Sequence, residues 1–93
     1  MKSYNIYFAT ENKKQLNKIL SLCVDIFGGY THVKTFGAWK DKDNKKHIEE
    51  ANKVTIITDK AKELKPLCKY INFVANQQST LLEATNNENK FIN

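Results

Sequence analysis

The chain has 93 residues, the length of one small domain with a single hydrophobic core. Its hydrophobic residues (41%) and aromatic residues (11%) exclude a wholly disordered chain, because they supply enough apolar surface for such a core. The net charge of +5 comes from fifteen lysines, and there is no arginine. Arginine grips phosphate and guanine through two parallel hydrogen bonds, so this composition argues against sequence-specific binding of nucleic acid.

The absence of certain sequence patterns predicts where the protein is found in the cell and whether it binds a metal ion. No apolar run approaches the ~18 to 20 residues that span a bilayer, and the N-terminus lacks the charged and then apolar pattern of a secretory signal. We therefore expect a cytoplasmic protein with no membrane partner. Cys23 and Cys68 stand among apolar residues, which is typical of buried free thiols in a reducing compartment. Neither belongs to a metal-binding spacing, so no metal and no cofactor are expected.

The first half of the chain predicts a strand, a helix and a second strand. Residues 4–10 alternate between apolar and polar positions, as in a half-buried strand. Apolar residues then recur at helical spacing over residues 16–27, with Thr10 or Asn12 as the cap and Gly28-Gly29 as the stop. Residues 30–39 are rich in Thr, Val and aromatic side chains and predict the second strand.

The second half predicts a hairpin, a helix and a last strand. Residues 40–46 are too polar for a core and indicate a hairpin tip that turns at Asp43-Asn44 and leads into a strand centred on 53–58. Because Pro66 is tolerated only in a first helical turn, the second helix should begin near Glu63. A strand over 79–85 follows, and 86–93 is a polar tail that we expect to be flexible apart from a short edge pairing at Phe91 and Ile92.

The order β-α-β-β-α-β predicts an α+β, ferredoxin-like domain that spans residues 1–93. Right-handed crossovers place both helices on one face of a four-stranded antiparallel sheet and leave the other face open. An uncovered face that carries aromatic and aliphatic side chains is a candidate contact surface. The residues expected on it are Tyr7, His32, Lys34, Phe36, Lys53, Thr55 and Ile57.

Several short motifs resemble a family of uncharacterised small bacterial and phage proteins. They are Gly28-Gly29-Tyr30-Thr31, Gly37-Ala38-Trp39, Glu49 or Glu50, and Gln77-Gln78-Ser79 followed by Leu81. The resemblance implies the same fold and a phage origin, and it brings no catalytic residue. In the last motif the family pattern has an acidic residue after Gln, whereas this chain has Gln78 or Ser79.

Our leading hypothesis from the sequence is a non-enzymatic binding protein encoded by a phage. It would counter host defence by sequestering an anionic ligand, such as a nucleotide signal, in a homo-oligomer formed through the open sheet face. Lysine attracts anions as a point charge, and aromatic side chains supply contact area. The expected ligand-binding residues are Tyr7, His32, Lys34, Phe36, Trp39, Lys53 and Thr55.

Three alternatives stay open at this point. The protein could inhibit a host protein directly, with Trp39 at the interface. It could be a small dimeric enzyme that uses His32, although no nucleophile, phosphate loop or metal set accompanies that histidine. It could bind RNA as RNA-recognition motifs do. Such domains stack RNA bases on an aromatic side chain of their third strand, however, and residues 53–58 contain no aromatic residue.

Overall fold

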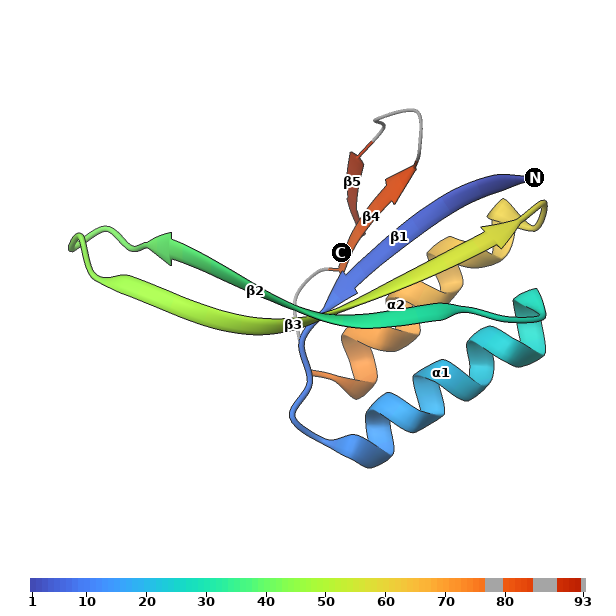
Figure 1. Cartoon of the computed structure of the whole chain (residues 1–93), viewed down its shortest axis with the longest axis horizontal. Helices are drawn as coiled ribbons and strands as arrows, with labels where there is room; N and C mark the ends of the chain where they lie inside the picture. Colours follow the sequence, from blue (N-terminus) through green and yellow to red (C-terminus); the bar gives the residue numbers. More distant parts are fainter. Residues whose placement is uncertain (77–79, 85–88, 93) are drawn as a thin grey trace.

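The computed structural model describes residues 1–76, 80–84 and 89–92, and it confirms the α+β, ferredoxin-like fold. Within these residues five strands form one sheet in the order β2-β3-β1-β4-β5, and all neighbours are antiparallel. The first four strands make the expected sheet, and β5 extends its edge. Both helices lie on one side of it (Figure 1). The elements are β1 (Lys2–Phe8), α1 (Lys13–Phe27), β2 (Thr31–Lys40), β3 (Lys46–Thr58), the 3-10 turn η1 (Ala61–Glu63), α2 (Leu64–Val74), β4 (Thr80–Ala84) and β5 (Asn89–Ile92).

Local signals set the ends of the helices as predicted. The side chain of Asn12 accepts hydrogen bonds from the backbone N–H groups of Lys14 (2.9 Å) and Gln15 (3.2 Å) and so caps α1. Helix α1 ends at Gly28, whose φ of 89° is a left-handed conformation that glycine adopts without strain. Helix α2 begins at Leu64, next to the expected start at Glu63, and Pro66 falls in its first turn.

The core lies between the helices and the inner face of β1 and β3. Cys23 and Cys68 are buried there, as the sequence predicted. Burial raises the pKa of Cys23 to about 11 and that of Cys68 to about 12, so both are protonated thiols at neutral pH. The largest fully buried apolar side chains are Ile6, Ile19, Val54, Ile56, Leu64 and Ile71.

Strand β5 is tied to the second helix. The Nδ2 of Asn72 donates to the backbone oxygen of Ile92 at 2.8 Å, and the hydroxyl of Thr80 donates to the Oδ1 of Asn72 at 2.6 Å. Ile92 is buried against the core. The expected edge pairing at the C-terminal end is therefore confirmed over 89–92, whereas positions 86–88 and 93 of the expected flexible tail lie outside the described residues.

The hairpin of β2 and β3 extends well beyond the helices (Figure 1). We call its outer part, from Phe36 to Glu50, the arm. Near the tip the indole of Trp39 stacks on the imidazole of His47, with 4.3 Å between ring centroids, and His47 pairs with Asp41 at 2.8 Å. The arm also leaves Phe36 largely exposed.

The predicted facing of β2 was wrong by one residue. His32 is paired with Val54, and Lys34 with Asn52, so both β2 residues lie on the helix side of the sheet. Phe36 has the same parity and lies on that side too. The reason is the turn: Lys40 pairs with Lys46, which leaves an odd number of residues in the loop, with Asn44 at a φ of 64°. A slip of one residue exchanges the two faces of a strand.

No helix in the described part of the chain is long and apolar enough to span a membrane.

Candidate active site

A cluster of polar side chains occupies the centre of the open face, on three adjacent strands. Asn5 of β1 is opposite Thr55 on β3 and opposite Glu83 on β4. Tyr7 is two residues further along β1, and side chains two apart on a strand share a face. We call these four residues the open-face cluster.

The open-face cluster is joined by a chain of hydrogen bonds. The hydroxyl of Thr55 donates to the Oδ1 of Asn5 at 2.7 Å, and the Nδ2 of Asn5 donates to the Oε1 of Glu83 at 2.8 Å. The hydroxyl of Tyr7 donates to the same carboxylate oxygen at 3.2 Å. Each of the four side chains is half-buried in this single chain. The carboxylate is thus held in place while it stays accessible from the open face.

The phenol of Tyr7 is held in its protonated form. Partial burial raises its pKa above the usual value, and both the hydrogen bond to Glu83 and the negative charge of Glu83 raise it further. The ammonium nitrogen of Lys53 lies 5.9 Å from the centre of the Tyr7 ring, within the range of a cation–π contact. Tyr7 is therefore a hydrogen-bond donor at neutral pH, with a cation beside it.

This arrangement suits a small ligand that carries both charges. An oriented carboxylate and an electron-rich ring attract a cationic group, and Lys53 attracts a carboxylate or phosphate. No group of three or more His, Cys, Asp or Glu side chains that could hold a metal ion occurs among the described residues. The chemistry open to the cluster is binding, orientation and proton transfer by Tyr7 and Glu83.

The structure brings together three of the residues that the sequence singled out, namely Tyr7, Lys53 and Thr55. The other four lie elsewhere. His32 shares a hydrogen bond of 2.8 Å with the buried Asn52 on the helix side, so the prediction that His32 lies on the open face with Tyr7 was wrong. Lys34 and Phe36 are on that side as well, and Trp39 is near the tip of the arm.

Two members of the open-face cluster were missed, Asn5 and Glu83. Asn5 lies in the predicted first strand, two residues before Tyr7, but it was not considered as a functional residue. Glu83 lies in a short run where Leu81 and Leu82 are both apolar, so alternation does not reveal which face it occupies. A lone acidic residue in a strand otherwise poor in charge is the signal that points to it.

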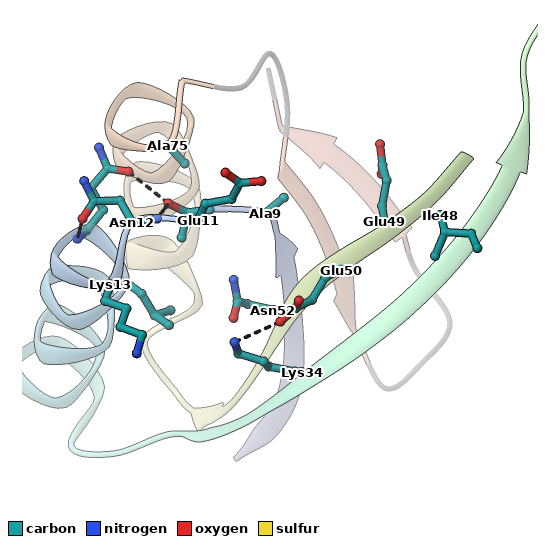
Figure 2. A pocket seen from close by; sticks show the side chains of 13 residues that line it. Ala9, Glu11, Asn12, Lys13, Lys34, Ile48, Glu49, Glu50, Asn52 and Ala75 are labelled. Carbon is teal, nitrogen blue, oxygen red and sulfur yellow. Dashed lines mark hydrogen bonds and ion pairs between the residues drawn. The ribbon is translucent and has the colours of Figure 1, made fainter. Parts of the chain in front are cut away.

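A concavity lies on the helix side, where the arm leaves the body of the domain (Figure 2). It has a volume of about 740 Å³ and contains neither Tyr7 nor Glu83. The ammonium of Lys34 pairs there with the carboxylate of Glu50 at 2.9 Å. The hollow mixes both signs of charge, with lining residues that include Glu11, Lys13, Lys34, Glu49 and Glu50.

No protein-family model and no curated protein sequence matches the chain. Among solved structures, the chain is similar to a phage SAM lyase in complex with S-methyl-5'-thioadenosine. The TM-score is 0.73 at 14% identity, and the match covers 98% of this chain and 88% of that one. A phage SAM lyase in the apo state is also similar, with a TM-score of 0.63 at 11% identity over 90% of this chain and 78% of the other.

These likenesses establish the fold, and they correct the prediction about function. We expected a non-enzymatic binding protein, either sequestering a ligand or inhibiting a host protein. Both similar structures are of a lyase, which is an enzyme, and this finding contradicts that expectation.

Proposed function

We propose that this protein is a lyase that cleaves S-adenosylmethionine (SAM) to S-methyl-5'-thioadenosine. The observation that carries the proposal is the hydrogen-bonded pair of Tyr7 and Glu83 on the open face. It occurs in a fold that is similar to a phage SAM lyase bound to S-methyl-5'-thioadenosine. That pair supplies an oriented carboxylate beside an aromatic ring, which is a suitable environment for a substrate that carries a sulfonium and an ammonium group.

The reaction can be balanced without water or an added base. A carboxylate oxygen of the methionyl part attacks its own γ-carbon, and the bond from that carbon to sulfur breaks. The sulfur keeps the electron pair of the broken bond and becomes a neutral thioether, S-methyl-5'-thioadenosine. The remaining fragment closes to homoserine lactone, which keeps the ammonium charge. No proton has to leave the substrate, so the task of the protein is to hold a reactive conformation.

The side chains around the open-face cluster can hold that conformation. The carboxylate of Glu83 binds the α-ammonium group, and the ring of Tyr7 lies against the sulfonium. Lys53 steers the negatively charged end of the substrate by point-charge attraction. Fixing the attacking oxygen in line with the breaking bond removes much of the entropic cost of the reaction.

This activity also accounts for a phage setting. SAM is the methyl donor of the cell, so a phage enzyme that removes it in the host cytoplasm would disable host defences that depend on methylation. The protein that we propose would therefore still counter host defence, and it would do so by turnover of SAM.

The test of the proposed function is turnover of SAM by the purified protein. We expect S-methyl-5'-thioadenosine and homoserine lactone to appear well above the rate without protein, as measured by liquid chromatography and mass spectrometry. S-Adenosylhomocysteine is the matched control compound: it lacks the sulfonium charge, its sulfur is a poor leaving group, and it should not react. SAM decay at the protein-free rate would contradict the proposal.

We also propose that a second copy of the chain covers the open face. Exclusion of water from the open-face cluster would strengthen its electrostatic attraction for the charged groups of the substrate. The neighbouring strands β2 and β3 also expose apolar side chains on this face, at Val33 (48% exposed) and Ile57 (61% exposed). Sedimentation velocity should therefore show a dimer or larger oligomer at micromolar concentration, and Ile57→Asp should shift it toward monomer. A monomer at all concentrations would contradict this proposal.

A further inference from the structure

We infer that Asn5 is a positioning residue that, held by Thr55, fixes the orientation of the Glu83 carboxylate, so that one of its oxygens faces the ligand. This inference rests on the proposed function, because it assigns Glu83 to substrate binding. Asn5 itself need not touch the substrate. Its contribution is to the orientation of a carboxylate on the neighbouring strand.

The chemistry of the groups determines the orientation of the Asn5 amide. An ionised carboxylate only accepts hydrogen bonds, so the side of Asn5 that meets Glu83 at 2.8 Å must be its NH₂ group. The amide oxygen then points to Thr55 on the neighbouring strand β3, at 2.7 Å. An oxygen acceptor requires a donor, so the hydroxyl of Thr55 donates. The hydrogen bonds therefore run in one direction: Thr55 donates to Asn5, and Asn5 donates to Glu83.

The two oxygens of Glu83 are consequently not equivalent. Oε1 accepts from both Asn5 and Tyr7, at 2.8 and 3.2 Å. Among the described residues, Oε2 accepts no hydrogen bond, and it is the oxygen left for a ligand. Rotating the carboxylate would break both bonds to Oε1, and hydrogen bonds to a charged group are among the stronger ones in proteins. Asn5 and Tyr7 together thus hold the carboxylate so that its other oxygen is left for a ligand on the open face.

Tyr7 reports on this arrangement independently of any activity. Its raised pKa depends in part on the hydrogen bond to Glu83 and on the charge of Glu83. If Asn5 holds the Glu83 carboxylate in place, loss of the Asn5 side chain lets that carboxylate move away from the phenol of Tyr7. The pKa of Tyr7 then falls. A residue that served only to stabilise the fold would leave this pKa unchanged.

The experiment uses three variants of the full chain. Asn5→Ala removes the donor to Glu83, Thr55→Val removes the hydroxyl but keeps the branched shape of the side chain, and Thr55→Ser keeps the hydroxyl. Each is titrated by tyrosinate absorbance, with Tyr7→Phe subtracted to isolate Tyr7, and each is assayed for SAM turnover. Thermal melting of each variant shows that it is folded.

We expect Asn5→Ala to lower the pKa of Tyr7 and to lower kcat/KM for SAM about tenfold or more. Thr55→Val should move both quantities in the same direction by less, and Thr55→Ser should restore both. An unchanged Tyr7 titration in folded Asn5→Ala and Thr55→Val would overturn the inference whatever the activity. Absence of SAM turnover by the unmodified protein would instead overturn the proposed function, and the titration would still decide the role of Asn5.

Discussion

Glu83→Gln is expected to lower kcat/KM for SAM roughly a hundredfold, since a substrate that is no longer held by its ammonium group loses the alignment that the intramolecular attack needs. Glutamine keeps the size of the side chain and an oxygen that can accept from Asn5, so the fold should be retained. The same change should lower the pKa of Tyr7, because the hydrogen bond and the charge of Glu83 both raise it in the unmodified protein. Steady-state kinetics and a tyrosinate titration measure the two effects.

Glu63→Gln is the matched control. Glu63 is exposed in η1, next to the helices and remote from the open-face cluster, so the same chemical change there should leave kcat/KM and the Tyr7 titration unchanged. A Glu83→Gln protein that turns over SAM at the rate of the control would contradict the role assigned to this carboxylate.

Among alanine substitutions in β3, Ile56→Ala should produce the largest loss of stability. Ile56 is fully buried and faces the helices, and truncation of such a side chain costs about 2 to 5 kcal/mol through lost burial and the cavity left behind. Small domains have a total free energy of unfolding of about 5 to 15 kcal/mol, so this loss is a large share of it. Urea unfolding followed by circular dichroism measures the difference.

Ile57→Ala tests the same substitution one residue along the strand. Ile57 is on the open face and 61% exposed, so in a monomer the change should lie within about 0.5 kcal/mol of zero. Unfolding is compared at the lowest practicable concentration, where self-association contributes least. Equal losses for the two variants would show that the pairing of β3 is shifted from the register described above.

The elements of this fold were predictable because their signals are local. Asn12 and the glycines after Phe27 mark the ends of α1, and Pro66 limits where α2 begins. On β1 and β3 the buried positions alternate, with Ile6 and Ile56 among them, so the open-face placement of residues between them was predicted correctly.

The facing of β2 was not predictable in the same way. Apolar and aromatic side chains occupy both parities of this strand, for example Val33 and Phe36, so its composition favours neither face. The decision depends on the number of residues in the loop that joins it to β3. An odd number of residues separates the paired Lys40 and Lys46, and His32 therefore lies on the face of the sheet that the helices cover.

The site was harder to predict than the fold because its members meet only through long-range pairing. Glu83 joins Asn5 solely because β4 pairs with β1, and nothing near either residue in the sequence indicates this contact. We predicted no enzymatic activity because the histidines and cysteines of the chain form no catalytic or metal-binding sequence motif. A pair of Tyr and Glu on adjacent strands has no such local pattern.

The distance along the chain between Tyr7 and Glu83, which is 76 positions, determines when the cluster can exist during synthesis. A ribosome makes β1 well before β4, and contacts of such high sequence separation form late and slowly. Until β4 has been translated, β1 has a neighbour on only one side and Tyr7 lacks its carboxylate. A cell that translates this message therefore gains the assembled cluster only in chains that include β4, and chains released before β4 lack Glu83.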